Sequence, residues 1–135
     1  MSHITSMIET HPNTTSDLDV AKLAECIAAC FECAQTCTAC ADACLGEEMV
    51  AELRDCIRLN CDCADICTAT GHILSRRTGS NLATVKAALE ACRIACAACA
   101  AECEKHAEMH EHCRVCAEAC RRCEQACADL LAVIG

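Results

Sequence analysis

Cysteine recurs on nearly every helical turn along most of this chain. The first run, CIAACFECAQTCTACADAC, extends from Cys26 to Cys44 and places its cysteines at steps of 4, 3, 4, 3 and 4. Steps of three and four residues trace one face of an α-helix. A chain with this spacing therefore directs a line of thiols to one side of each helix.

The apolar core must be built largely from cysteine. Leu, Ile, Val and Phe make up only 24 of 135 residues, and with a net charge of −9 this share is typical of disordered chains. The 19 cysteines change that reading, because a protonated thiol behaves as a small hydrophobic side chain and is often buried. Alanine is abundant and proline nearly absent, so the composition favours helix.

The pattern predicts an all-α fold, an antiparallel up-down-up-down four-helix bundle with a short N-terminal arm. We expect the arm at residues 1–15 and one bundle domain at residues 16–135. The helices are expected at about residues 16–45, 47–77, 81–106 and 111–133.

Capping residues mark the predicted helix ends. Thr15 or Ser16 is expected to cap the first helix, with Asp17 and Asp19 in its first turn. Glycine at position 46 would end that helix, and serine at position 80 would cap the third.

All four predicted helices carry cysteines at positions where a bundle normally has leucine. Asn60 fills one missing step of the pattern, and Cys61 lies one place off the line. The cysteines are Cys26, Cys30, Cys33, Cys37, Cys40 and Cys44 on the first helix, Cys56, Cys61, Cys63 and Cys67 on the second, Cys92, Cys96, Cys99 and Cys103 on the third, and Cys113, Cys116, Cys120, Cys123 and Cys127 on the fourth.

Two structural explanations of this pattern fit poorly: that cysteine only fills the core, and that the cysteines form disulfides. Leucine would bury more apolar surface than cysteine and stabilise a bundle better, at about 25 cal/mol per Å². Disulfides are disfavoured by the odd number of cysteines, by a chain long enough to fold without them, and by the reducing cytosol that we expect for it.

Metal binding explains the spacing better, and all 19 cysteines are candidate ligands. Soft thiolates select Cu(I), zinc or iron–sulfur clusters. Zinc prefers a few closed tetrahedral sites and iron–sulfur clusters prefer one compact set of four cysteines, whereas Cu(I) accepts two or three shared sulfurs. A Cu⁺ ion that replaces one thiol proton also leaves the core neutral, and buried net charge is very costly. The sequence therefore predicts multiple Cu(I) ions per chain.

The two ends of the predicted bundle differ in chemistry. His106 and His110 continue the thiol line at one end, and Met109 lies beside them. All three are candidate copper ligands for a mouth through which metal passes. We interpret His112 as a solvated residue of the turn. Asn60 is either a polar ligand or a hydrogen-bonded core residue, and we favour the second role. The opposite end is predicted to be an apolar plug of Leu23, Ile73, Leu74, Val85, Leu89, Leu130, Leu131 and Ile134.

Several classes of partner are not expected. The N-terminal residues lack the basic start and apolar run of a secretory signal, and no apolar stretch is long enough to span a membrane. The acidic balance argues against nucleic acid and anionic membranes. No arrangement of nucleophile and base stands out, so we do not expect an enzyme.

The repeated Cys-x-x-x-Cys and Cys-x-x-Cys spacings on all four helices resemble those of the cytosolic bacterial copper storage proteins, over about residues 17–133. The resemblance implies storage of many Cu(I) ions per protomer, a homotetramer, and a mouth at the His/Met end. A zinc or mixed-metal thiolate buffer and a copper chaperone remain as alternatives. A copper chaperone or efflux system is a possible donor or acceptor of the metal.

Overall fold

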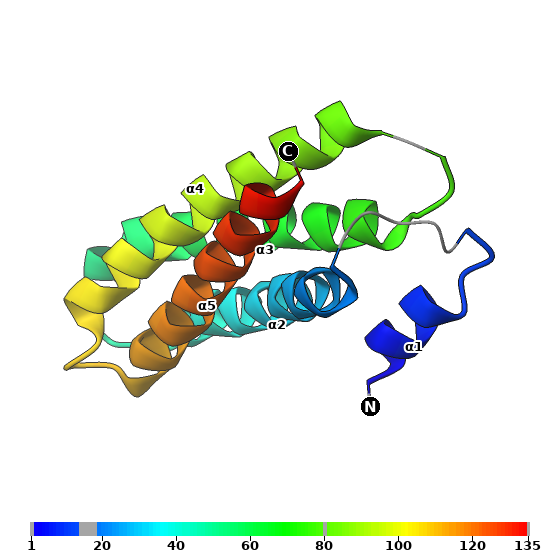
Figure 1. The fold of residues 1–135 in the computed structure, drawn as a ribbon. Coiled ribbons are helices and arrows are strands. Elements are labelled where there is room, and N and C mark those ends of the chain that lie inside the picture. The colour runs from blue at the N-terminus through cyan, green and yellow to red at the C-terminus, as the bar shows by residue number, and fades with distance from the viewer. Residues whose placement is uncertain (1, 14–18, 80, 135) are drawn as a thin grey trace.

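Four long helices lie side by side and form a bundle in the computed structural model, which describes residues 2–13, 19–79 and 81–134. The long helices are α2 (Val20–Leu45), α3 (Arg54–Ser75), α4 (Leu82–His106) and α5 (Glu111–Val133), as Figure 1 shows. A 3₁₀ turn, η1 (Val50–Leu53), precedes α3. Helix α2 packs against α3 and α5, and α4 packs against the same two helices, so consecutive helices are neighbours as in an up-and-down bundle.

The helix ends agree only in part with the sequence prediction. Asp19 is the N-cap of α2, where its carboxylate accepts hydrogen bonds from the backbone N–H groups of Ala21 and Lys22, so it does not lie in the first turn. Gly46 ends α2 as predicted. Thr15, Ser16, Asp17 and Ser80 lie outside the described residues.

The second helix was predicted to begin at residue 47, which is wrong. A turn at residues 46–49 and η1 intervene, and α3 begins only at Arg54. Leu53 is fully buried, so η1 brings an apolar side chain into this end of the core before α3 starts. The turn between α4 and α5 lies at residues 107–110, as predicted.

The predicted N-terminal arm carries a short helix, α1 (His3–Glu9), that the sequence analysis did not foresee. Ser2 caps this helix through a hydrogen bond to the backbone N–H of Thr5, and Ile4 and Ile8 pack against the bundle core. Figure 1 shows α1 beside the end of the bundle where α2 begins and α5 finishes.

Small side chains let the helices approach one another. The buried alanines include Ala34, Ala64 and Ala126, each of which is next to a cysteine of the thiol line in the sequence. A glycine serves the same purpose at position 71 of α3, where a Cβ atom would lie 2.7 Å from the ring of Phe31. Ile27 is buried and Phe31 is half-buried, so both residues flank the bundle core.

The end of the bundle near the termini is apolar. Leu23, Leu74, Leu89, Leu130 and Ile134 are buried there. Val85 and Leu131 pack against them, and position 73 is half-buried. The predicted apolar plug is therefore confirmed. None of the helices in the described ranges combines the length and apolarity needed to cross a lipid bilayer.

Candidate metal centre

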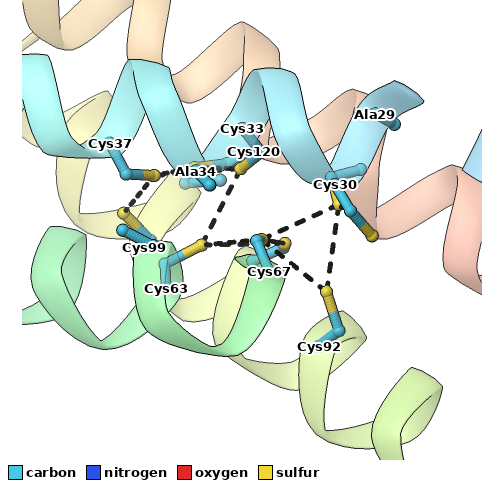
Figure 2. Packing of buried hydrophobic residues seen from close by; sticks show 14 of the residues in the cluster. Ala29, Cys30, Cys33, Ala34, Cys37, Cys63, Cys67, Cys92, Cys99 and Cys120 are labelled. Carbon is cyan, nitrogen blue, oxygen red and sulfur yellow. Dashed lines mark hydrogen bonds between the residues drawn. The ribbon is translucent and has the colours of Figure 1, made fainter. Parts of the chain in front are cut away.

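Eighteen of the 19 cysteines are buried, and we call them the thiol column. All 19 thiols are free. Figure 2 shows Cys37, Cys63 and Cys99 pointing from three different helices toward a shared interior. The helical spacing thus becomes a line of sulfur atoms along the bundle axis.

The sulfur atoms of the column gather into overlapping groups of four. Within each group, all Sγ atoms lie within 4.8 Å of one another. Five such groups are Cys30, Cys92, Cys123 and Cys127; Cys33, Cys63, Cys67 and Cys96; Cys33, Cys37, Cys63 and Cys120; Cys37, Cys99, Cys116 and Cys120; and Cys40, Cys44, Cys56 and Cys113. Because several cysteines belong to two groups, neighbouring groups can share ligands.

Contacts between helices set the spacing of these sulfurs. The Sγ atoms of Cys37 and Cys120 lie 3.5 Å apart, and those of Cys67 and Cys96 lie 3.6 Å apart. A metal ion bonded linearly to two thiolates, each at about 2.3 Å, needs sulfurs about 4.5 Å apart. Small rotamer changes therefore suffice to admit a two-coordinate ion between helices.

The interior thiols hydrogen-bond to one another, and these bonds shift their acidity in both directions. Hydrogen bonds from neighbouring cysteines, with burial in addition, raise the pKa of Cys30, Cys96 and Cys120. Hydrogen bonds from other cysteines lower the pKa of Cys33 and Cys92. A row of buried thiolates would repel one another in a low-dielectric core. Without metal, the column therefore behaves as an apolar core of thiols.

Asn60 is the polar side chain within the column, and it is fully buried. Its Oδ1 atom accepts hydrogen bonds from the thiols of Cys99 at 2.9 Å and Cys116 at 3.1 Å. Its Nδ2 group donates to Cys56 Sγ at 3.6 Å. The side chain is thus satisfied by thiols, which confirms the interpretation of Asn60 as a hydrogen-bonded core residue.

Two histidines and one carboxylate meet at the end of the column near the α4–α5 turn, and we call this end the mouth. Glu47 Oε2 lies 3.1 Å from His110 Nδ1 and 2.8 Å from His112 Nε2. The two imidazole rings are stacked, with centroids 5.5 Å apart. The other ring nitrogen of His112, Nδ1, lies 3.4 Å from Cys40 Sγ and 3.6 Å from Cys113 Sγ.

These contacts tune the charges at the mouth. The hydrogen bond to His112 lowers the pKa of Glu47. Partial burial of His112 opposes its charged form, but its bonds to Cys40 and Glu47 outweigh burial and raise its pKa. Hydrogen bonds, first that of Cys103, lower the pKa of Cys40 to about 6, whereas burial raises the pKa of Cys44 to about 11. Of these two thiols, Cys40 therefore gives up its proton more readily than Cys44.

The other residues predicted at the mouth differ in position. His106 is half-buried, and its Nε2 lies 2.9 Å from a carboxylate oxygen of Glu102. His110 is buried. Met109 is 64% exposed, so its thioether lies mostly in solvent rather than among the thiols. Cys61 is exposed, and the structure does not place it in the column.

The interpretation of His112 as a solvated turn residue is wrong, and the role of Glu47 was missed. His112 lies in the first turn of α5, one residue before Cys113, so helical periodicity places it off the thiol line. Its contact with Cys40 depends on how the 107–110 turn directs the start of α5 toward α2. The available signal for Glu47 was its position immediately after Gly46, which ends α2 and so places this carboxylate at the end of the bundle.

Comparison with known proteins adds independent information. The family model for copper storage protein matches residues 19–132. The chain is similar to the copper storage protein Ccsp of Streptomyces lividans loaded with 10 copper equivalents, with 55% identity, coverage of 97% of this chain and 99% of that chain, and a TM-score of 0.95.

Two further solved structures are similar. A cytosolic copper storage protein from Streptomyces lividans carrying five coppers has 61% identity over 85% of this chain and 96% of that chain, with a TM-score of 0.84. Cu(I)-bound copper storage protein BsCsp3 has 38% identity over 78% of this chain and 94% of that chain, with a TM-score of 0.70. No match was found among curated protein sequences.

Proposed function

The chain belongs to the copper storage protein family, and from this premise we propose that it stores many Cu(I) ions as copper thiolates in the thiol column. The observation that carries the proposal is the series of overlapping groups of four buried sulfurs, each within 4.8 Å. A series of shared groups provides capacity, whereas a chaperone needs one accessible site and a zinc protein needs separate tetrahedral sites.

Charge balance favours a monovalent ion in this column. The eighteen buried thiols share one low-dielectric interior, where neighbouring thiolates would repel one another, so the metal-free column stays mostly protonated. When Cu⁺ displaces one proton, the core stays neutral at every stage of loading, whereas Zn²⁺ must displace two protons for each ion. The 5 to 10 copper equivalents carried by the Streptomyces relatives support the same choice of metal.

The proposed ligands are the eighteen cysteines of the column, which excludes the exposed Cys61. We propose that metal passes through the mouth, with His106, His110 and His112 as nitrogen ligands on the way. Met109 is exposed enough to meet an incoming ion first. The opposite end is filled mainly by buried leucines, and the hydroxyl of the buried Thr70 there already donates hydrogen bonds to backbone carbonyls, so we propose no exchange of ligands at that end.

Further features of the biological unit are proposals. We propose that the protein is a homotetramer in the cytoplasm. A copper chaperone or efflux system would give copper to it or take copper from it. We propose no binding to nucleic acid or membranes and no catalytic activity. The name of the cytosolic Streptomyces relative supports the compartment. We also propose that residues 1–15 form an arm and residues 16–135 the storage domain, and the family match at residues 19–132 supports this division.

Anaerobic titration with Cu(I) against a chromophoric chelator tests the function. We expect a stoichiometry close to the number of buried cysteines. Saturation at one to four ions would contradict storage. Zinc that stays bound against the same chelator, with little Cu(I) uptake, would favour the thiolate buffer instead.

A further inference from the structure

A single carboxylate oxygen connects the two histidines at the mouth. Glu47 lies in the turn after α2, and the histidines lie at the start of α5, so the contact joins two separate connections of the bundle. Glu47 Oε2 is 3.1 Å from His110 Nδ1 and 2.8 Å from His112 Nε2. The carboxylate uses a different ring nitrogen in each histidine.

This difference has a consequence for the position of the protons. A carboxylate only accepts hydrogen bonds, so each contacting ring nitrogen must carry the N–H group. A neutral imidazole has one N–H, and the hydrogen bond at one nitrogen determines which nitrogen remains free. His110 therefore holds its proton on Nδ1, and His112 holds its proton on Nε2.

The two free nitrogens are placed where a metal ligand is needed. His112 Nδ1 faces the sulfurs of Cys40 and Cys113 at 3.4 Å and 3.6 Å. His110 Nε2 is buried without a hydrogen-bond partner, and among the buried side-chain nitrogens and oxygens in residues 2–13, 19–79 and 81–134 it alone lacks one. Burial removes such an acceptor from water without replacing its hydrogen bond, so this nitrogen is suited to receive a ligand.

We propose that Glu47 is the positioning residue of the copper mouth, because it sets His110 and His112 in opposite tautomers and thereby turns one nitrogen lone pair of each stacked ring toward incoming Cu(I). The identity of the ion rests on the proposed storage function, whereas the tautomers rest on the geometry alone. Glu47 itself is not the ligand, since soft Cu(I) prefers sulfur and imidazole nitrogen to a carboxylate.

The competing explanation is that Glu47 only adds negative charge and so attracts cations. Glu48 provides a matched control, because it is the next residue, carries the same charge and is exposed. A purely electrostatic role predicts similar effects for Glu47→Ala and Glu48→Ala. A positioning role predicts an effect for Glu47→Ala alone.

The first measurement needs no metal. Nitrogen-15 NMR of the reduced, copper-free full chain, at a pH where both rings are neutral, reports which nitrogen of each histidine carries the proton. We expect Nδ1–H for His110, which is the minor form of free histidine, and Nε2–H for His112. In Glu47→Ala we expect His110 to change to Nε2–H, and in Glu48→Ala we expect no change. An Nε2–H form of His110 in the unaltered protein would overturn the proposal.

The second measurement follows uptake of the first Cu(I) ions from a chelated donor by stopped flow. Loss of a residue that orients a metal-binding histidine typically costs about 10–100-fold, and we expect Glu47→Ala to slow uptake by this factor. Glu47→Gln keeps an acceptor oxygen at the same reach and should recover most of the rate, while Glu48→Ala should leave it unchanged. Equal slowing in Glu47→Ala and Glu48→Ala would overturn the proposal.

The two measurements separate this inference from the storage function. Final copper capacity should be the same in all of these variants, because the thiol column is intact. If neither the unaltered protein nor any variant retains many Cu(I) ions, the proposed storage function is wrong. The NMR measurement of the two tautomers would still test the role of Glu47.

Discussion

The two ends of the bundle are built on the same four helices but with opposite chemistry. At the mouth, Glu47 and two stacked histidines meet buried thiols. At the plug, leucines such as Leu89 and Leu130 are fully buried. An ion that leaves its carrier needs a sequence of new ligands, and the mouth gathers imidazole nitrogens beside thiols for that exchange. We therefore expect the stability of the fold to depend mainly on the plug and the exchange of metal ligands to depend on the mouth.

The largest expected effect concerns the plug. Leu89→Ala removes a fully buried side chain and should lower the free energy of unfolding by about 2–5 kcal/mol, as measured by urea unfolding of the reduced protein. Leu82 on the same helix is 45% exposed, so Leu82→Ala should change stability by less than about 0.5 kcal/mol. If Leu89→Ala instead accelerated copper uptake, the plug would act as a second mouth and the comparison would fail.

A smaller effect is expected at Asn60. Asn60→Ala leaves the thiols of Cys99 and Cys116 without their acceptor and should cost about 1–3 kcal/mol in urea unfolding. Thr68→Ala is a control, because that exposed hydroxyl donates only to a carbonyl of its own helix. Similar stability losses in both variants would show that the thiols do not depend on Asn60.

Single thiols should separate uptake from capacity. Cys113→Ser, near His112, should slow Cu(I) uptake about tenfold, equivalent to about 1.4 kcal/mol in the barrier, and reduce capacity only slightly. Cys96→Ser, within the interior groups, should reduce capacity with little change in the rate of uptake. Stopped-flow mixing and anaerobic titration measure the two quantities. Equal effects of both variants on both quantities would contradict a single mouth.

The smallest effect is a pH dependence of stability. The lowered pKa of Glu47 adds stability above its ordinary value of 4.5, and this contribution disappears as pH falls. The raised pKa of His112 adds stability below its ordinary value of 6.5, and this contribution disappears as pH rises through the folded-state pKa. The difference in unfolding free energy between the unaltered protein and Glu47→Ala should therefore be largest between these pH values. A difference that is independent of pH would argue against the ion pair.

The sequence was sufficient for the bundle and for most of the column. Regular steps of three and four place residues such as Cys26 and Cys127 on the inner faces whatever the loops do, because helix geometry alone determines the face. Asn60 could be placed in the column for the same reason. Cys61, one residue off the pattern, is exposed as that periodicity requires.

The mouth could be predicted only in part, because its contacts depend on connections rather than on periodicity. Glu47 reaches the histidines only through the path of the turn at residues 46–49, and η1 delays the start of α3. His112 contacts Cys40 across 72 positions of the sequence. Such pairings arise when the helices pack, and no local spacing encodes them.

The distribution of the sulfur groups also bears on the synthesis of the chain. Four of the five groups of four named above take sulfur from α5, which is made after the other three bundle helices, and the fifth, which contains Cys96, needs α4. A growing polypeptide therefore finishes none of these five groups before α4 has been made. A product that ends before α5 would keep only one of these five sulfur groups, so it would lose most of them and not merely a proportional share.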